Sequence, residues 1–236
     1  MASKLRRQGE VLSAFDPGAE LRDTEFIDCT FEGCRWNGVR VQNCTFSGCR
    51  FLRCQFSAVV FSFCLMKDAV MEGCAFRGIS WGGLQGRSAL VQPFARLKNC
   101  VFQYNEFSGM ALAGFDFSTC QFRECVFDDC KLTGAGFHGV PLGRTAFSRC
   151  DLQKADFRMA EAYAINPADN RMKGARFSFP DVVALLDSSG IQIQKKNGPT
   201  GTGYPVGPLC CRNKLIWNNP ERRKWLYRCA RWWHLP

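Results

Sequence analysis

The chain has 236 residues with a formal net charge of +10, and 46% of its residues are hydrophobic. This length is enough for one domain with appendages, and no segment approaches the roughly 20 consecutive apolar residues that a membrane-spanning helix needs. Residues 197–236 hold seven basic residues and one acidic residue, so they supply +6 of the charge and the remaining body only +4. The body is nearly balanced, and its charged residues are expected to form a solvated surface.

The N-terminal segment, residues 1–20, is expected to form a short cap on the domain that follows. It shows only a faint form of the pattern described below. Its first eighteen residues include five charged residues, which argues against a secretory signal peptide.

Residues 21–81 repeat with a period of five. A large apolar residue occupies every fifth position, and the residue two positions earlier is small in every repeat but the last. The large residues are Leu21, Phe26, Phe31, Trp36, Val41, Phe46, Phe51, Phe56, Phe61, Met66, Met71, Phe76 and Trp81. Neither the two-residue period of a strand nor the 3.6-residue period of a helix keeps such residues on one side. A chain that turns a corner every five residues does, and four corners close a coil of twenty residues.

The same period returns in a second block that runs from Leu97 to Phe157 and, with a transition, to residue 179. The two blocks place apolar residues at 26 of 26 central positions, where a composition with 46% apolar residues would fill about half by chance. Internal repetition therefore determines the fold. Four repeats in each coil predict about six and a half coils, and a rod roughly 30 Å long at the ~4.8 Å spacing of stacked strands.

This pattern resembles the pentapeptide-repeat family over about residues 20–160. Its members have a central Phe or Leu with a small residue two positions earlier. The resemblance implies an all-β fold, a right-handed quadrilateral β-helix.

Residues 82–96 interrupt the repeat. Trp81 and Leu97 are sixteen residues apart, which is three pentapeptides plus one residue, so the second block is out of phase with the first. We expect this segment to bulge from the rod, either as a tolerated insertion or as a loop that carries specificity. Its candidate partner contacts are Gln85, Arg87, Gln92 and Arg96.

Fifteen cysteines raise the question of disulfides or a metal site. All twelve cysteines of the first 196 residues fall in the small column, where free cysteine behaves as a small buried hydrophobe. Pairs five residues apart do not match the spacing of zinc ligands. We therefore predict structural packing, no metal, no cofactor, and reduced thiols in a cytoplasmic protein.

The period changes after Phe177, which indicates a different element. Ser178 and Asp181 have the spacing of a capping box, and apolar residues at helical spacing follow them. The segment 180–194 is therefore expected to hold a short helix over 181–188 and a strand over 191–193. Such a helix can cap the solenoid and pair with a second copy of itself.

The same region is similar to the C-terminal ending of the gyrase-protecting members of the family. These are the albicidin-resistance, microcin-immunity and, more distantly, Qnr quinolone-resistance proteins. The residues that carry the resemblance are Ile165-Asn166-Pro167, Asn170-Arg171, Ala175 to Pro180, Leu185-Leu186 and Gly190-Ile191. Those proteins are dimers joined tip to tip through this element. The resemblance implies a homodimer whose interface residues are Val182, Val183, Leu185 and Leu186.

Residues 195–236 differ in composition from the rest of the chain. A Gly- and Pro-containing linker leads into a basic tail that holds four of the six tryptophans. We expect this segment not to pack on the rod. The alternative is a basic amphipathic helix that binds a membrane surface or nucleic acid.

Catalytic motifs are absent from the sequence, which has only two histidines and no phosphate-binding or zinc-protease motif. A filled rod has no interior pocket, so we do not expect an enzyme. The resemblance implies a target-protection protein that binds DNA gyrase, with topoisomerase IV as a further target, by mimicking the shape of DNA. It implies resistance to a topoisomerase poison such as albicidin, a microcin or a quinolone. The rod itself is not expected to bind nucleic acid or a membrane.

An acidic side would favour such mimicry. The best cluster consists of Glu106, Asp128 and Asp129, which recur on one side at about twenty-residue spacing. The alternative function is an interaction scaffold or effector module with an unrelated protein partner, because a repeat fold does not by itself determine the partner.

Overall fold

The computed structural model describes residues 4–13, 15–85, 93–189 and 191. The chain divides into two compact units, Met1–Gln192 and Ile193–Pro236, and the described residues all belong to the first. The basic tail, the predicted strand beyond Ile191, and the loop residues Arg87 and Gln92 lie outside the described residues.

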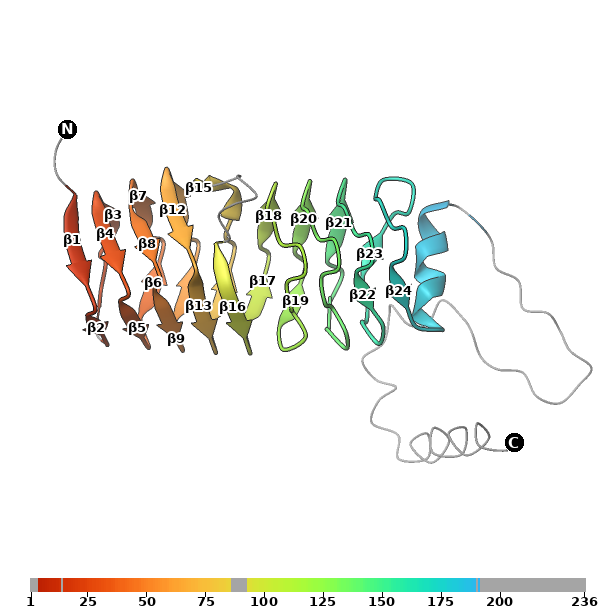
Figure 1. The fold of residues 1–236 in the computed structure, drawn as a ribbon, viewed down its shortest axis with the longest axis horizontal. Coiled ribbons are helices and arrows are strands. Elements are labelled where there is room, and N and C mark those ends of the chain that lie inside the picture. Colours follow the sequence, from red (N-terminus) through yellow and green to blue (C-terminus); the bar gives the residue numbers. More distant parts are fainter. Residues whose placement is uncertain (1–3, 14, 86–92, 190, 192–236) are drawn as a thin grey trace, which may run out of the picture. The chain divides into compact units, whose positions relative to one another are not determined.

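The described unit is an all-β solenoid of about eight turns, whose short parallel strands follow one another along a rod (Figure 1). Each strand pairs with the strand one coil earlier, usually twenty residues back, so that Phe46 lies beside Phe26 and Phe51 beside Phe31. Four strands complete a coil, and the rod therefore has four sides, which we name A to D in chain order.

Side A begins with β1 (Leu5–Gln8), β4 (Thr24–Ile27), β8 (Thr45–Ser47), β12 (Cys64–Lys67) and β15 (Leu84–Gln85). Side B has β2 (Val11–Leu12), β5 (Thr30–Glu32), β9 (Arg50–Leu52), β13 (Ala69–Glu72) and β16 (Phe94–Lys98), and later β22 (Asp156–Phe157) and β24 (Arg176–Phe177). In the second block, isolated bridges and tight turns replace strands on much of sides A and B.

Side C consists of β6 (Arg35–Asn37), β10 (Gln55–Ser57), β14 (Ala75–Arg77), β17 (Val101–Gln103) and β19 (Gln121–Arg123). Side D has β3 (Glu20–Arg22), β7 (Arg40–Gln42) and β11 (Val60–Ser62), then the 3₁₀ turn η1 (Trp81–Gly83). It continues with β18 (Glu106–Ser108), β20 (Val126–Asp128), β21 (Ala146–Ser148) and β23 (Ala164–Ile165).

The corners explain why five residues suffice for one side. Two positions after a central residue, the backbone commonly has a positive φ, as at Gly48 (62°) and Asp28 (52°). Glycine adopts this conformation at low cost, and Asp and Asn tolerate it better than most residues. A Cβ at position 48 would in addition lie 2.3 Å from Oδ1 of Asp28, so the Asp28 carboxylate would have to move to admit a side chain there.

The central residues form stacked columns inside the rod. The rings of Phe107 and Phe127 stack with centroids 4.5 Å apart, and Phe147 continues the column at 5.0 Å from Phe127. Rings on adjacent sides meet edge to face, as do Phe26 and Phe31 at 5.2 Å. Both geometries suit the quadrupole of aromatic rings.

The twelve cysteines of the small column are buried free thiols, in agreement with their predicted packing role. Within the described residues, eleven of these thiols, all but that of Cys120, donate a hydrogen bond to a carbonyl one coil earlier, as Cys74 does to Phe51 at 3.3 Å and Cys54 to Phe31 at 3.3 Å. Burial raises the pKa of Cys49 and of Cys120 to about 12, so these thiols stay protonated.

The predicted coil count of six and a half is too low. Strands β1 and β2 already pair with the following coil, with Leu5 beside Thr24 and Val11 beside Thr30. The residues of each pair are nineteen apart in the sequence, one fewer than the twenty of a full coil. A search for a strict five-residue period therefore misses this first coil. Phe15 lies 5.5 Å from Phe31 (ring centroids) over the first full coil.

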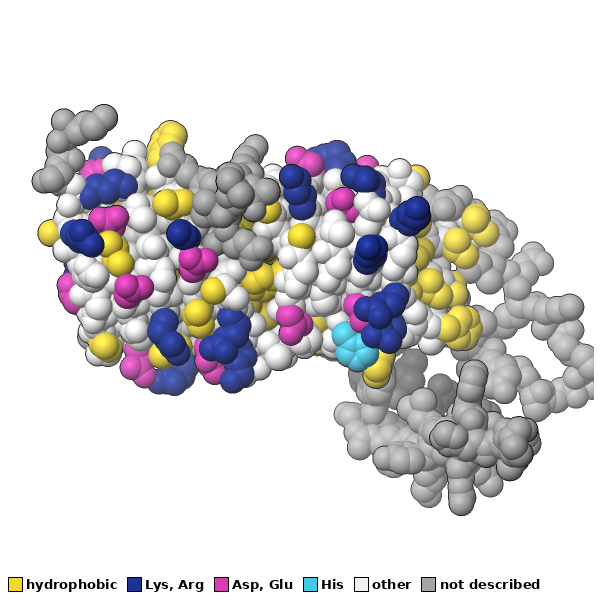
Figure 2. Space-filling view, in the orientation of Figure 1, with side chains coloured by type: hydrophobic (Ala, Val, Ile, Leu, Met, Phe, Trp, Pro, Cys, Tyr) yellow, Lys and Arg dark blue, Asp and Glu magenta, His cyan; other side chains and the backbone are white. Residues whose placement is uncertain are grey.

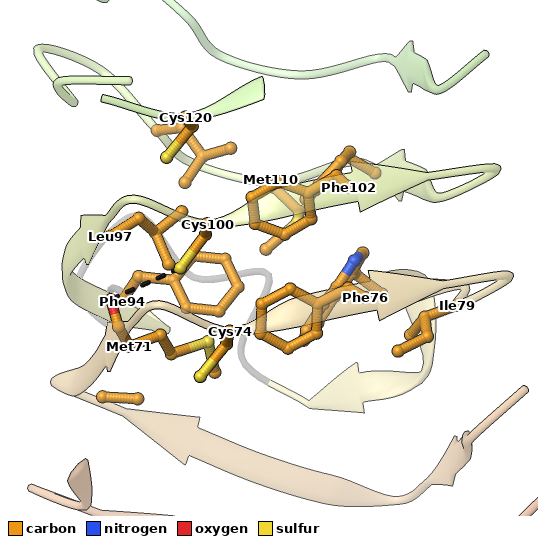
Figure 3. Packing of buried hydrophobic residues seen from close by; sticks show 14 of the residues in the cluster. Met71, Cys74, Phe76, Ile79, Phe94, Leu97, Cys100, Phe102, Met110 and Cys120 are labelled. Carbon is orange, nitrogen blue, oxygen red and sulfur yellow. Dashed lines mark hydrogen bonds between the residues drawn. The ribbon is translucent and has the colours of Figure 1, made fainter. Parts of the chain in front are cut away.

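The interruption lengthens one coil by six residues. Met71 pairs with Leu97, twenty-six residues later, and the register shifts at Ala69 and Val70, where Phe94 takes the place opposite Ala69. Phe94 is fully buried and its ring lies 5.4 Å from that of Trp81, so a large side chain fills a position that is small elsewhere (Figure 3).

The C-terminal end of the rod is closed by η2, a 3₁₀ helix over Asp181–Ser189, next to β24 (Figure 1). The carbonyl of Ser178 accepts a hydrogen bond from the N–H of Val182 at 3.0 Å, while its hydroxyl accepts one from the N–H of Met159 at 3.1 Å. Leu185 packs against the core, so the helix covers the last coil.

Replacing a central ring should destabilise the rod strongly. Phe127→Ala removes a side chain that stacks on both neighbouring coils, and we expect a loss of about 3–5 kcal/mol in the free energy of unfolding in urea. Phe63→Ala is the matched control, since Phe63 is 65% exposed at a corner and should change stability by less than about 1 kcal/mol. Equal losses in the two variants would contradict the stacked core.

Candidate functional site

The interior of the rod offers no chemistry. Within residues 4–191, as far as they are described, no group of three His, Cys, Asp or Glu residues could hold a metal ion. None of the described helices is long and apolar enough to cross a membrane. Apolar side chains and cysteines fill the described interior, and on the outer surface acidic and basic side chains are interspersed on the face seen in Figure 2.

Side D carries the most acidic surface of the four. Its outward side chains and corners include six carboxylates and three arginines. The carboxylates are Glu20, Asp23, Glu106, Asp128, Asp129 and Asp169, and the arginines are Arg22, Arg40 and Arg149. The predicted cluster is thus brought together, because β18 and β20 are neighbours with Ser108 beside Asp128. Sequence analysis missed the other three carboxylates.

The carboxylates of side D differ in how they are neutralised. Asp128 forms an ion pair with Arg149, and Glu20 pairs with Arg22 at 2.6 Å, which lowers the pKa of Glu20. Glu106 and Asp129 are exposed, and neither has a basic partner within 4 Å among the described residues. Among the described residues, Asp23 and Asp169 also have no ion pair but accept hydrogen bonds from Asn43 and Ser148, so Glu106 and Asp129 are the carboxylates of side D with neither kind of side-chain partner.

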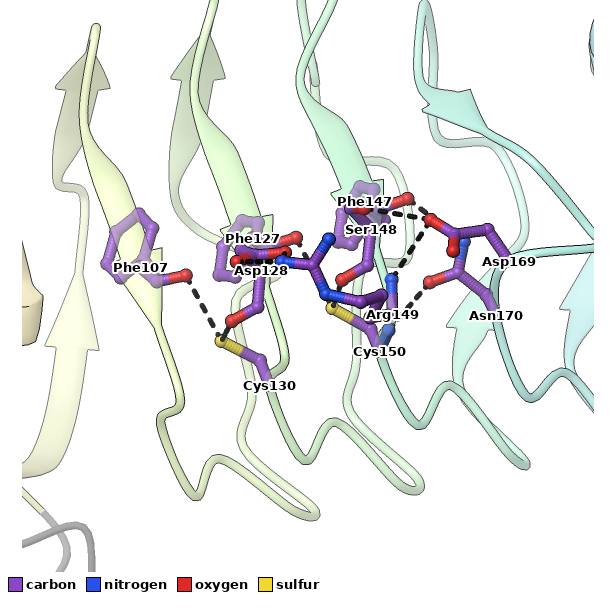
Figure 4. Close-up of polar contacts among 10 residues, drawn as sticks. All are labelled: Phe107, Phe127, Asp128, Cys130, Phe147, Ser148, Arg149, Cys150, Asp169 and Asn170. Carbon is purple, nitrogen blue, oxygen red and sulfur yellow. Dashed lines mark hydrogen bonds and ion pairs between the residues drawn. The ribbon is translucent and has the colours of Figure 1, made fainter.

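Hydrogen bonds between coils hold this surface in place (Figure 4). The thiol of Cys150 donates to the carbonyl of Phe127 at 3.3 Å. One coil later Asn170 takes the cysteine position, accepting from the N–H of Cys150 at 2.8 Å and donating to the carbonyl of Phe147 at 2.9 Å. Next to it Asp169 accepts from Ser148 Oγ at 2.8 Å, so the C-terminal part of side D is fixed on several coils.

Of the predicted loop contacts, Arg87 and Gln92 lie outside the described residues, and the other two lie on other sides of the rod. Arg96 is exposed on β16, which belongs to side B, opposite side D in a four-sided coil. Gln85 ends β15 on side A, and its side chain is not described. Arg96 and the acidic cluster therefore lie on opposite sides of the rod.

The predicted dimer residues lie on η2 at the end of the rod. Val182, Val183 and Leu185 are half-buried, and Leu186 is 37% exposed. Phe179, 76% exposed, adds to the apolar side chains that gather over this end in Figure 2. The helix thus keeps part of its apolar surface in solvent.

Comparison with known proteins agrees with this architecture. Residues 17–91 match the model of the pentapeptide repeat region. Over these residues the chain is similar to the pentapeptide-repeat family. It is distantly similar to Qnr proteins: the quinolone resistance pentapeptide repeat protein QnrB96 of Scandinavium goeteborgense is 37% identical over 82 residues. That match covers 35% of this chain and 36% of the relative, so the similarity spans about a third of each.

Two solved structures illustrate the likeness. Full-length QnrB1, a plasmid-mediated fluoroquinolone resistance protein, is 19% identical with a TM-score of 0.29, over 79% of this chain and 100% of that one. HetL from the cyanobacterium Nostoc sp. strain PCC 7120, involved in heterocyst differentiation regulation, is 12% identical with a TM-score of 0.31, over 73% and 83%.

The last two coils of this pentapeptide-repeat rod are joined by a carboxylate. Asp156 on β22 binds Arg158 at 2.7 Å and Arg176 of β24 at 3.3 Å, and its side chain is only 13% exposed. The hydrogen bond from Arg158 lowers the pKa of Asp156 from 3.8 to about 2. A carboxyl whose pKa is lower in the folded chain stabilises it above the unfolded pKa and loses this effect as the pH falls through the folded pKa.

Asp156→Asn should therefore destabilise the rod in a pH-dependent way. We expect a loss of up to about 2 kcal/mol at pH 7, shrinking as the pH falls below 3.8 and small by pH 2, measured by urea unfolding. Asp68→Asn, an exposed corner residue of side A, is the control and should show little difference at any pH. A deficit that stays constant down to pH 2 would mean that packing, and not charge, is lost.

Proposed function

We propose that this pentapeptide-repeat protein is a non-catalytic binding protein that protects a type II topoisomerase, DNA gyrase or topoisomerase IV, from a topoisomerase poison. The observation that supports this most is the 37% identity with a quinolone resistance protein in the repeat region. The poison would be a quinolone or a compound with the same target, such as albicidin or a microcin.

The physical basis of the proposal is imitation of DNA by a right-handed rod with one acidic side. About eight turns at ~4.8 Å give a rod of roughly 38 Å, and two rods joined at their ends would span roughly 77 Å, the length of some 22 base pairs. The exposed carboxylates Glu106 and Asp129 of side D would meet the basic residues with which a topoisomerase holds DNA. Only the outward carboxylates take part, because the interior of the rod is filled.

The two rods would be joined through η2. The apolar residues Val182, Val183, Leu185 and Leu186 lie on this helix, and a two-fold axis would place each helix against its copy. Support comes from the exposure of Leu186 and Phe179, since the ends of a solenoid need cover. A pair of rods also presents two acidic sides to a topoisomerase that has two-fold symmetry.

Drug protection tests the proposal directly. The full chain is added to gyrase and relaxed plasmid in the presence of ciprofloxacin or albicidin, and we expect it to restore supercoiling. The variant Glu106→Gln/Asp129→Asn should need about ten times more protein for the same effect, because it loses the two unpaired carboxylates of side D. The control Glu25→Gln/Asp68→Asn removes two carboxylates from side A, one on a strand and one at a corner. It should behave as wild type.

Two results would contradict the proposal. If the wild-type chain neither restores supercoiling under either drug nor inhibits gyrase at excess, it does not act on gyrase, and the same assay is then run with topoisomerase IV decatenation. If both double variants lose activity equally, net charge and not side D matters.

A charge on η2 should separate the two rods. Leu186→Arg places a guanidinium in the proposed apolar interface, and we expect light scattering after size exclusion to give the mass of one chain where wild type gives two. Phe63→Arg, which adds the same charge at an exposed corner of side D, should leave the mass unchanged. A wild-type mass of one chain would overturn the dimer.

A further inference from the structure

Side C differs in charge from the other three sides. Its five strands present ten outward side chains, and none of them is Asp or Glu. Those that bear on binding are Arg35, Arg77, Arg123, Gln55, Gln103 and Gln121. These five strands therefore form a strip of guanidinium and amide groups, which we name the arginine strip. The carboxylates of side C lie at its edge and beyond it, at the corner residue Glu124 and at Glu161 after β19.

Two of the three guanidinium groups are free to bind an anion. Among the described residues, neither Arg35 nor Arg77 has a carboxylate within 4 Å. Arg77 lies over the ring of Tyr104, with 5.7 Å between Cζ and the ring centroid, and this ring is 47% exposed. Arg123 shares Glu124 with Arg144, at 3.7 and 2.8 Å. An exposed arginine without a partner can still take a carboxylate in a bidentate arrangement.

A shallow hollow of about 230 Å³ lies in the middle of the strip. Its floor is Ala75 and Val101 over the buried rings of Phe56 and Phe76, and Gln55 and Gln103 stand at its sides. Ala75 is the shortest outward side chain on these strands, which is why the surface sinks there. A partner can thus place an apolar side chain between amides that bind its peptide groups.

The width of the strip selects the kind of partner. Each strand here has three residues, so outward side chains lie roughly 7 Å apart across the strip. Carboxylates border it on both sides, with Glu72 on β13 and Glu106 on β18. A DNA duplex is far wider than this and would contact those carboxylates. One extended polymer running along the rod fits.

The spacing along the rod favours a peptide. Arg77 and Arg123 lie in one row on alternate strands, roughly 10 Å apart along the rod, and Arg35 lies two strands before Arg77 in the other row, roughly 7 Å across the strip. In a polyproline II segment every third residue faces the same way, at roughly 9.3 Å. Single-stranded nucleic acid is held by several stacking aromatic residues, whereas among the described residues of this side Tyr104 is the one exposed aromatic ring.

We propose that the arginine strip binds an extended acidic segment of a partner protein, with carboxylates at every third residue and apolar residues between them. This surface is separate from the acidic side D, and the inference does not rest on topoisomerase protection.

The experiment uses a fluorescent peptide of repeated Glu-Pro-Leu triplets, titrated with the full chain and followed by anisotropy. We expect saturable binding that weakens about tenfold in Arg35→Gln/Arg77→Gln. The control Arg50→Gln/Lys67→Gln removes the same charge from exposed residues of sides B and A that have no ion pair among the described residues. Residues 197–236 carry +6 in every variant, so only the difference between the variants counts.

Three outcomes overturn the inference: no binding of the peptide, equal weakening in both double variants, or tighter binding of a single-stranded oligonucleotide of similar length and charge. A peptide with Lys in place of Glu should not bind. Because Arg35→Gln/Arg77→Gln leaves side D and η2 intact, its drug protection should equal that of wild type if topoisomerase protection holds. Failure of one proposal is therefore distinguishable from failure of the other.

Discussion

The register between coils is the constraint on which this structure depends. Every central ring must lie on the ring one coil earlier, since only then do the rings stack at about 5 Å, as Phe137 does on Phe157 at 4.9 Å. The same register lets most of the cysteine thiols reach a carbonyl of the preceding coil, as Cys130 reaches Phe107 at 3.3 Å. A buried thiol donor is satisfied in this way by the backbone and needs no side-chain partner, so a small residue suffices at this position. Outward side chains inherit the register and form vertical rows on each side.

The register leaves a clear pattern in the sequence, a large apolar residue at every fifth position with a small residue two positions earlier. The sequence was therefore sufficient to predict the solenoid, its four sides and the burial of its cysteines. It was not sufficient where the register shifts. β1 pairs at nineteen residues, Phe147 pairs with Ile165 at eighteen, and Met71 pairs with Leu97 at twenty-six. A search with a constant five-residue period cannot find these changes in coil length. They depend on how bulges and turns absorb the added or missing residues in three dimensions.

The candidate surfaces show the same limit. Glu106, Asp128 and Asp129 could be placed together since no shift separates them. The lengthened coil separates Glu20 and Asp23 from the predicted cluster, and the shortened coil separates Asp169 from it. That these three carboxylates belong to side D could be seen only from the pairing of strands. The unpaired state of Arg35 and Arg77 was equally hidden, because an ion pair on this rod joins residues about twenty apart, as Arg144 and Glu124 are.

Sides C and D share an edge and carry opposite charge, and this determines how partners can approach. A rigid, filled rod cannot change its surface when it binds, so a partner selected by the carboxylates of side D is repelled at the neighbouring guanidinium groups if it is broad and basic. In the proposed binding mode, a DNA-binding groove would have to contact side D without enclosing side C. Binding along side D therefore requires that side C face solvent or a second, acidic partner, and the arginine strip is where such a partner would be held without competing for the first.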